Sequence, residues 1–245
     1  DRLLYDLEGL DWPTSTLSMQ KDWIGRSEGA DIDFCIEESD ERIRVYTTRP
    51  DTLFGATFMV LAPEHPFVES INTPTVTAYV TEARNRSDVD RMADSKEKTG
   101  VDTGMVAINP ANGVKIPIWI ADYVLMGYGH GAIMAVPAHD ERDHAFATAH
   151  NIPIIEVVQP NEPSEGCFAG EGIAINSASD AVSIDSQQTV EAKQTIINWL
   201  KKTGCGFGKV NYRLRDWLFS RQRYWGEPFP IVFDEQGRHY PISEL

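Results

Sequence analysis

Cysteine, basic residues and long apolar runs are scarce in this chain, and each scarcity removes a class of protein. Three cysteines occur among 245 residues, none in a Cys-x-x-Cys pair, which favours reduced, buried thiols over disulfides, redox chemistry or a zinc ribbon. A mean hydropathy of -0.31 without a long apolar run excludes a membrane span. The opening Asp1-Arg2-Leu3 is unlike a secretory signal, so we expect a cytoplasmic protein.

Positive charge is also in deficit, because 22 Lys and Arg stand against 37 Asp and Glu and leave a formal net charge of -15. Such a surface repels phosphate backbones. Tight binding of nucleic acid would therefore require a local basic cluster or the help of another domain. The length of 245 residues suits one large domain or two ordinary ones.

Motifs for metal, phosphate and covalent chemistry are missing as well. His139 and His144 flank acidic residues, but their spacing is not that of His-Glu-x-x-His, so no metal site is predicted. No serine lies in Gly-x-Ser-x-Gly and no Gly-rich phosphate loop occurs. Any hydrolysis here is expected to activate water directly, without a cofactor.

Hydrophobic periodicity and turn residues predict a mixture of strands and helices. The expected strands cover 42–46, 58–62, 105–108, 114–120, 132–136 and 152–158, and Asn112-Gly113 favours a hairpin turn. The expected helices begin at Pro74, near Asp143, and at Asp185 or Ser186, the last ending at Gly204. Residues 3–20 lack clear periodicity, and 159–172 resemble a surface loop. Without a clean βαβ alternation, the pattern favours an α+β fold.

The first candidate for chemistry is the segment from Tyr46 to Thr52. It places several hydroxyls, the cation of Arg49 and the carboxylate of Asp51 at the end of a predicted strand, where loops commonly carry function. The alternative is structural, a strand edge followed by a turn closed at Pro50-Asp51.

The second candidate is the Gly-rich segment over 128–143. Its glycines let the backbone approach a ligand, and the period of two puts Met134 on a face that lines either core or pocket. His139, Asp140 and Asp143 cluster polar groups beside that face. The alternative is again structural: Asp140 caps a helix, Asp143 complements the helix dipole and His139 bonds a carbonyl.

Together the two segments carry a family resemblance. Thr-Thr-Arg-Pro-Asp-Thr-Leu-Phe-Gly-Ala-Thr at 47–57 and Gly-Tyr-Gly-His-Gly-Ala-Ile-Met-Ala-Val-Pro-Ala-His-Asp-Glu-Arg-Asp at 127–143 look like bacterial-type leucyl-tRNA synthetase, a class I aminoacyl-tRNA synthetase. Trp-Ile-Gly-Arg-Ser-Glu-Gly at 23–29 and the stretch 214–226 are similar to the segments that flank its inserted editing domain. Isoleucyl- and valyl-tRNA synthetases share this insertion and are the alternative relatives.

The resemblance implies a domain arrangement. Residues 1–22 would lead in from the synthetic core, 23–212 would form the editing (connective polypeptide) domain, and 213–245 would return to the core. In that family the editing domain is a mixed, β-barrel-like sheet core wrapped by helices. The His-Ile-Gly-His and Lys-Met-Ser-Lys-Ser signatures that serve ATP chemistry in the parent enzymes do not occur here, so these residues are not expected to perform aminoacylation.

The resemblance also implies post-transfer editing. In this reaction, the ester that links norvaline, an isoleucine-like side chain or methionine to the 3′-terminal adenosine of leucine tRNA is hydrolysed. Such proofreading is needed because one methylene gives a binding pocket only about 1–3 kcal/mol of discrimination. Thr52 matches the residue that excludes leucine by steric collision, and Asp143 matches the residue that holds the substrate α-ammonium. The implied partners are the 3′ end of leucine tRNA and the remainder of the synthetase.

Other residues match positions around that substrate. Thr47 and Thr48 are expected to orient water or the ester carbonyl, and no general base is assigned. Arg49 is expected to balance developing charge or contact the terminal phosphate, or to pair with Asp51 or Asp140 as structure. The remaining implied binding residues are Tyr128, Gly129, His130, Met134, Val136, His139 and Asp140.

Two readings from other classes stand beside editing. A catalytically degenerate module would dock tRNA without hydrolysing it, and the intact Thr47, Thr48, Thr52 and Asp143 argue against that reading. A freestanding hydrolase would act on mischarged tRNA alone, and ends that resemble synthetase core sequence argue against it.

Overall fold

The computed structural model describes residues 1–71, 73–86, 91, 99–126, 129–162, 166–214, 231–236 and 238–241. Backbone contacts divide the chain into two compact units, one of Asp1–Arg26 with Tyr212–Leu245 and one of Ser27–Asn211. The first unit contains α1 (Arg2–Asp6), α2 (Thr14–Ile24) and the antiparallel pair β10 (Ile231–Phe233) and β11 (His239–Pro241). The helices α1 and α2 lie in the segment for which no periodicity predicted an element.

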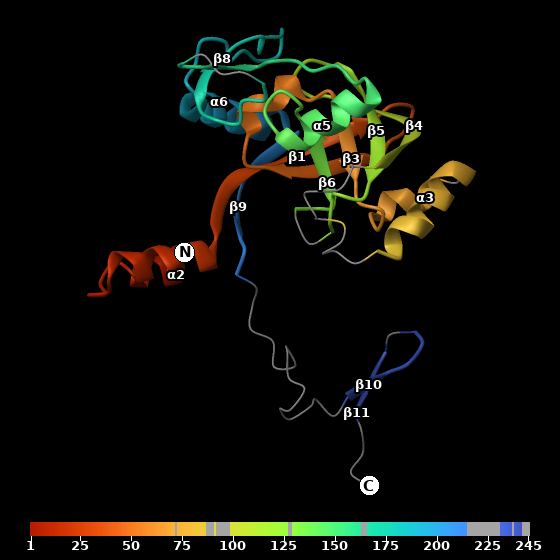
Figure 1. Cartoon of the computed structure of the whole chain (residues 1–245), viewed down its shortest axis with the longest axis horizontal. Helices are drawn as coiled ribbons and strands as arrows, with labels where there is room; N and C mark the ends of the chain where they lie inside the picture. Colours follow the sequence, from red (N-terminus) through yellow and green to blue (C-terminus); the bar gives the residue numbers. More distant parts are fainter. Residues whose placement is uncertain are drawn as a thin grey trace. The chain divides into compact units, whose positions relative to one another are not determined.

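A mixed seven-stranded sheet forms the centre of the Ser27–Asn211 unit (Figure 1). The strand order is β2-β1-β4-β5-β3-β6, and β9 pairs with β1 outside this path. The parallel pair is β3 with β5, while β1–β2, β1–β4, β4–β5 and β3–β6 are antiparallel. The strands are β1 (Arg26–Ile36), β2 (Arg42–Thr47), β3 (Phe58–Leu61), β4 (Gly100–Ile108), β5 (Lys115–Ala121), β6 (Ala132–Ala135) and β9 (Gly206–Tyr212).

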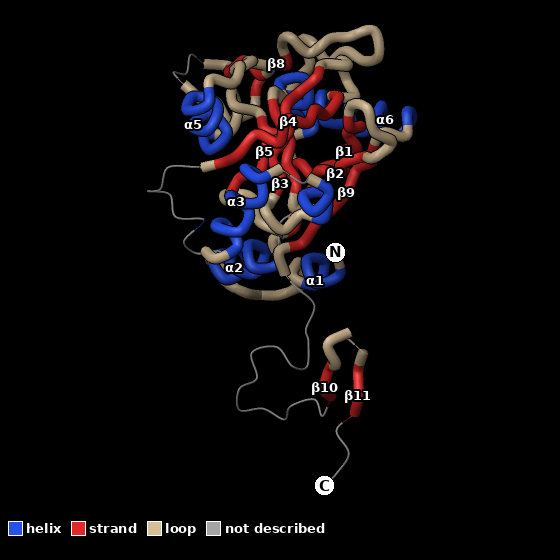
Figure 2. The backbone as a smooth tube through the Cα atoms, turned by 90° about the vertical axis from the view of Figure 1, so that its right-hand side faces the viewer, coloured by secondary structure: helices blue, strands red, loops and turns tan. Residues whose placement is uncertain are grey.

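The sheet curls so that its end strands β2 and β6 contact each other. No strand pairing within the described residues joins them, so the sheet approaches a barrel without closing. The helices α3 (Pro74–Arg84), α5 (Glu141–His150) and α6 (Thr189–Thr203) lie on the outside of the strands (Figure 2). The unit also contains the short 3₁₀ helices η1 (Pro50–Gly55), whose residues are all buried, and η2 (Pro66–Ser70). The predicted α+β fold with a mixed sheet core is confirmed.

Two of the predicted elements are wrong in part. Residues 152–157 form no strand, and only β7 (Val158–Pro160) pairs, with β8 (Gly172–Ala174). Pro153 lacks the amide hydrogen that a ladder requires, and Ile154 and Ile155 are exposed. The last helix begins at Thr189 and not at Asp185 or Ser186, because Ser186 has a φ of 69°, outside the right-handed helical region.

The predicted hairpin connects β4 to β5 and helps to place the first candidate segment. Gly113 has a φ of 71°, the left-handed conformation that the turn requires. Asn109 at the start of the turn is fully buried and donates its side-chain amide to the Leu53 carbonyl at 2.7 Å. The turn therefore fixes η1, which also packs against α6.

Two expectations drawn from the composition concern the cysteines and membrane-spanning segments. All three cysteines are free, but Cys35 is exposed and Cys167 and Cys205 are partly exposed, so the expected burial is wrong. Within the described part of the chain, every helix is too short or too polar to cross a bilayer.

An aromatic cluster fixes α5 on the sheet. Phe146 of α5 is fully buried, stacks on Phe58 with ring centroids 5.4 Å apart, and meets Trp119 edge to face at 5.3 Å. Gly100 permits this approach, because a Cβ there would lie 2.7 Å from the Phe146 ring. The cluster thereby positions the helix that carries Asp143.

Replacing Phe146 with alanine should lower the free energy of unfolding by about 3–5 kcal/mol, because it removes a large buried ring and leaves a cavity. Urea denaturation measures the change. The control is Val190→Ala on α6, whose side chain is 70% exposed and whose loss should matter by about 0.5 kcal/mol or less. A cost for Phe146→Ala near that of the control would contradict the assigned role of the cluster.

Candidate active site

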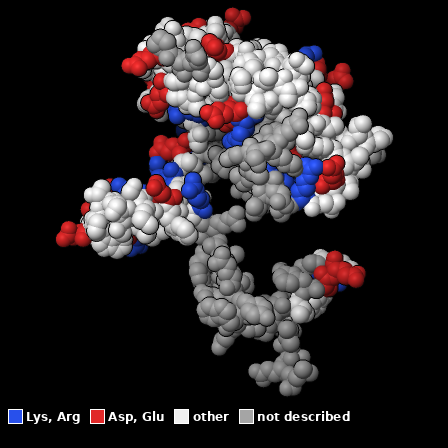
Figure 3. Space-filling view, viewed as in Figure 1, with Lys and Arg blue, Asp and Glu red and all other residues white. Residues whose placement is uncertain are grey.

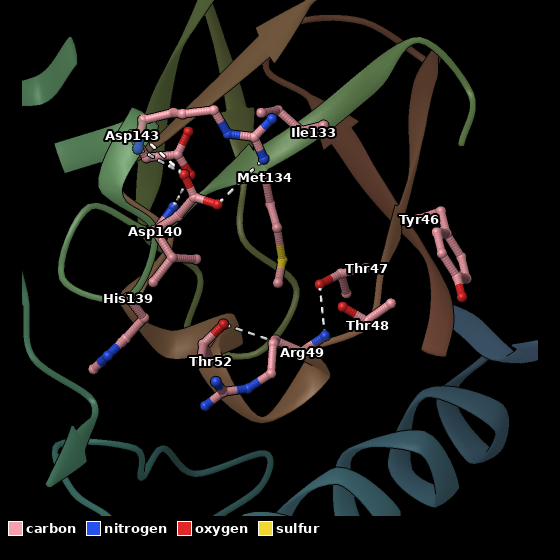
Figure 4. A pocket seen from close by; sticks show the side chains of 12 residues that line it. Tyr46, Thr47, Thr48, Arg49, Thr52, Ile133, Met134, His139, Asp140 and Asp143 are labelled. Atoms are coloured by element: carbon pink, nitrogen blue, oxygen red, sulfur yellow. Dashed lines mark hydrogen bonds and ion pairs between the residues drawn. The ribbon is translucent and has the colours of Figure 1, made fainter. Parts of the chain in front are cut away.

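A cavity of about 200 Å³ lies between the end of β2, η1, β6 and the first turn of α5. The two candidate segments, which are about 80 residues apart in sequence, form its opposite walls (Figure 4). The lining residues are Tyr46, Thr47, Thr48, Arg49, Thr52, Ile133, Met134, Val136, His139, Asp140, Arg142 and Asp143.

Of the predicted site residues that the structure describes, all but Gly129 and His130 line this cavity. Tyr128 lies outside the described residues. Gly129 packs against Tyr46, since a Cβ at Gly129 would lie 3.3 Å from the Tyr46 Cβ. The His130 Nε2 lies 3.0 Å from a carboxylate oxygen of buried Asp31, so this side chain is engaged beside the cavity and not within its wall.

Three lining residues, Tyr46, Ile133 and Arg142, were not predicted. Tyr46 belongs to the first candidate segment but was assigned no role. The alternation of β6 puts Ile133 on the opposite face from Met134, so a period of two gives no signal for it. Arg142 lies between Asp140 and Asp143 at the beginning of α5. This closeness in sequence to two predicted site residues was the signal that could have identified it.

The first wall is held by hydrogen bonds at the end of β2. The Thr47 hydroxyl accepts from the Arg49 amide at 3.0 Å, and the Thr52 hydroxyl donates to the Arg49 carbonyl at 2.9 Å. Thr52 is only 1% exposed. Its side chain is therefore held in one orientation in the wall of the cavity.

Arg49 pairs with Asp51, which was one of the structural roles that the sequence left open for it. Its guanidinium lies 2.8 Å from the carboxylate of buried Asp51, and it also donates to the carbonyls of Ala169 at 2.9 Å and Gly170 at 3.1 Å. In Figure 4 the guanidinium points away from Met134 at the centre of the site.

Asp143 is the buried carboxylate of the second wall. It is 5% exposed, accepts the Val136 amide at 2.9 Å, and accepts the Tyr123 hydroxyl at 3.2 Å. In Figure 4 the Met134 side chain extends from β6 into the space between this carboxylate and Thr47 and Thr48. The anion therefore faces a cavity with an apolar floor and a hydroxyl-bearing wall.

The pKa of Asp143 is raised to about 7, mainly by burial and to a smaller extent by the negative charge of Asp140. The hydrogen bonds from Val136 and Tyr123 and the charge of Arg142 lower the pKa, but not enough to offset desolvation. Within the described residues no basic side chain forms an ion pair with Asp143. The site thus holds a carboxylate that a cation entering the cavity would stabilise.

Asp140 performs the capping role that was its structural alternative. Its carboxylate accepts the amides of Arg142 at 2.9 Å and Asp143 at 3.2 Å, at the beginning of α5. Arg142 lies 3.4 Å from the same carboxylate and has a half-exposed side chain. This loose pair leaves the guanidinium at the rim of the cavity.

His139 is also bound to the protein backbone. Its Nε2 accepts the amides of Val157 at 3.0 Å and Val158 at 3.1 Å, which requires the tautomer with hydrogen on Nδ1. That Nδ1 donates to the Phe168 carbonyl at 2.7 Å. Burial lowers the pKa of His139, so the ring is neutral at pH 7.

The raised pKa of Asp143 predicts how stability depends on pH. The native carboxyl keeps its proton up to about pH 7, whereas the unfolded one loses it near 3.8, so stability is lost as pH rises through this window. The reference is Asp143→Asn, whose amide can bond Val136 and Tyr123 without titrating. Relative to it, the wild-type free energy of unfolding should fall by up to about 4 kcal/mol in urea titrations. A constant difference would show that Asp143 is ionised throughout.

Comparisons with known proteins identify the family to which the chain belongs. A family model described as the editing domain of leucyl-tRNA synthetase matches residues 21–201. The whole chain is 51% identical to leucine–tRNA ligase of Streptomyces coelicolor and 53% identical to that of Chloroherpeton thalassium, but covers only 28% and 31% of those proteins. It thus spans less than a third of the length of these curated relatives.

A solved structure supports the same relationship. The agnB2 LeuRS of Agrobacterium radiobacter K84, in a ternary crystal structure with tRNA and LeuAMS, superposes with a TM-score of 0.73 at 36% identity. The match covers 99% of this chain and 28% of that one. The chain therefore belongs to the family of leucyl-tRNA synthetase editing domains.

Proposed function

We propose that this chain performs post-transfer editing as the aminoacyl-tRNA deacylase domain of a leucyl-tRNA synthetase. Its substrate is the ester that joins norvaline, an isoleucine-like residue or methionine to the 3′-terminal adenosine of leucine tRNA. The observation that carries the proposal is Asp143, a buried carboxylate whose pKa is raised to about 7. It lines a cavity that has threonines on the first wall and apolar side chains on the second.

The α-ammonium of an aminoacyl ester is the cation that this carboxylate lacks. Its approach lowers the pKa of Asp143, and a charge-assisted hydrogen bond then replaces the missing solvation. A free amino group is common to every aminoacyl-tRNA, so Asp143 binds the substrate class without choosing among side chains.

Thr52 supplies the choice. Its hydroxyl is fixed by donation to the Arg49 carbonyl, so its methyl group cannot turn away to admit a bulkier ligand. Leucine branches at Cγ and collides with this side chain, whereas unbranched norvaline and methionine pass. Selectivity thus comes from repulsion of the cognate amino acid.

Hydrolysis requires little beyond positioning. Thr47 and Thr48 lie across Met134 from Asp143 (Figure 4), where their hydroxyls can orient water or the ester carbonyl. An ester held in this way, with its own vicinal hydroxyl beside the leaving oxygen, reacts with positioned water. We assign no general base, cofactor or metal. Arg49 and Asp51 shape the wall, and Met134 and Val136 contact the amino acid.

The body of the tRNA is held by the rest of the synthetase. On the face shown in Figure 3, basic side chains of the Ser27–Asn211 unit lie beside acidic ones without a continuous basic surface, and the whole chain has a net charge of -15. Only the 3′ end then enters this domain. We assign residues 23–212 to the editing domain of a cytoplasmic enzyme. Residues 1–22 then lead in from the synthetic core, and residues 213–245 return to it.

Thr52→Ala should open the site to leucine. Loss of the methyl and hydroxyl removes a barrier of about 1–3 kcal/mol, so hydrolysis of leucyl-tRNA should rise by roughly 10- to 200-fold. Thr52→Val keeps the volume and branching and should still spare leucyl-tRNA. Deacylation of radiolabelled leucyl-tRNA measures both. If Thr52→Ala clears norvaline but leaves leucine attached, the steric gate lies elsewhere.

Asp143→Asn should reduce kcat/KM for norvalyl-tRNA by at least roughly 30-fold, because truncating one partner of a buried charge pair costs about 2–5 kcal/mol. Asparagine is preferred to alanine, which would leave the buried Val136 amide unpaired at a cost of about 1–3 kcal/mol. The assay compares norvalyl- and leucyl-tRNA, with the chain alone and with a full-length synthetase that contains it. Inactivity of both wild-type proteins would favour the degenerate docking module.

A further inference from the structure

A short backbone strap joins the two walls of the cavity from outside. The strap is residues 168–170, and it receives Arg49 from the first wall, at the carbonyls of Ala169 and Gly170. From the second wall it receives His139, whose ring donates to the Phe168 carbonyl at 2.7 Å. Both side chains line the cavity, yet their polar ends point away from it.

The second wall and the strap are also joined through backbone. The Phe168 amide donates to the Ala138 carbonyl at 3.0 Å, next to the His139 contact. Beyond the strap, Gly172 exchanges two hydrogen bonds with the buried Thr189 hydroxyl, at 2.9 and 3.0 Å. Thr189 begins α6, which packs against η1, so the strap is fixed at both ends to elements that carry the site.

His139 transmits this restraint to the amine-binding carboxylate. Its own amide donates to the Val136 carbonyl at 2.9 Å, and the Val136 amide in turn donates to Asp143. The turn from Val136 to Asp143 is thereby held as one unit, and the His139 ring is its side-chain attachment to the strap, beside the backbone bond at Ala138. A shift of the ring would displace Asp143 relative to Thr52.

We propose that His139 is a positioning residue. Through its hydrogen bond to the strap at Phe168, it sets the distance between Asp143 and the first wall, which carries Thr52. It touches no reacting atom and transfers no proton. The assignment rests on the proposed editing function. This role replaces the direct substrate binding that was expected of His139. It also explains why a buried imidazole lies at the wall of the site with both ring nitrogens bonded to the protein backbone.

A pair of substitutions separates the two attachments of the ring. His139→Gln places an acceptor near the Nε2 position and keeps the Val157 and Val158 amides paired, but it loses the donor to Phe168. His139→Asn places a donor near the Nδ1 position and keeps the strap, but it leaves the two amides of the β7 segment unpaired. The first variant should lose catalysis and the second should lose stability.

The measurements are kcat and KM for norvalyl-tRNA and the thermal midpoint, in the full-length synthetase that contains this chain. His139→Gln should lower kcat on the order of 100-fold, as misplacement of a bound substrate does, with KM changed less than about threefold. His139→Asn should restore at least roughly tenfold of that loss while melting at a lower temperature. The matched control is Gln194→Ala, which removes a 3.0 Å side-chain bond to Asn198 on the exposed face of α6, away from the cavity, and should leave kcat unchanged.

The outcomes are distinguishable. Equal loss of kcat in both His139 variants, or loss in proportion to the thermal midpoint, would overturn the positioning role and leave a structural one. Full activity of His139→Gln beside active wild type would overturn this inference alone. Wild-type enzyme that does not deacylate norvalyl-tRNA would overturn the proposed function and this inference together.

Discussion

The hydrogen bond from the Val136 amide to the Asp143 carboxylate, 2.9 Å long, is the contact on which the rest of the site depends. It joins the residue that follows β6 to the first turn of α5, and it keeps a carboxylate in a cavity where water cannot solvate it well. Desolvation then makes the ionised form unfavourable until a cation arrives. The fold accordingly leaves the ionised carboxylate without a compensating positive charge, and an ammonium group supplies that charge. Recognition of a charged substrate therefore follows from the burial of Asp143.

Most other polar side chains of the site are already committed to the protein. Asp140 caps α5, His139 bonds the strap and the β7 segment, and Arg49 pairs with Asp51. The structural and functional alternatives raised from the sequence are therefore compatible, because each side chain lines the cavity with its stem and satisfies the backbone with its polar end. A site with so few uncommitted polar groups suits a reaction that requires orientation more than acid–base chemistry.

Local signals were sufficient for several elements and insufficient for others. The strand ending at Thr47, the Asn112-Gly113 turn and the helix capped by Asp140 depend on neighbouring residues, and the sequence predicted them. The long strand β1 was not predicted, because Asp31 interrupts its apolar pattern. That carboxylate is buried beside Lys209 and His130, which are distant in sequence and each lie 3.0 Å from one of its oxygens. Partners of this kind cannot be read from spacing.

The same distinction applies to the site. The family motifs gave the residues of both walls, and the structure shows those walls facing each other. The directions of the polar ends of Arg49 and His139 depend on backbone carbonyls of the strap, which no motif marks.

The unpaired contact between β2 and β6 has a consequence for how such a site diversifies. Within a hydrogen-bonded ladder, neighbouring strands keep a nearly constant spacing of about 4.8 Å whatever side chains they carry. At this seam the strands meet without a ladder among the described residues, so the width of the cavity is set by the volume of side chains such as Tyr46 and Met134. One scaffold can therefore be refitted to amino acids of different size by exchanging wall residues, while every paired strand stays in register.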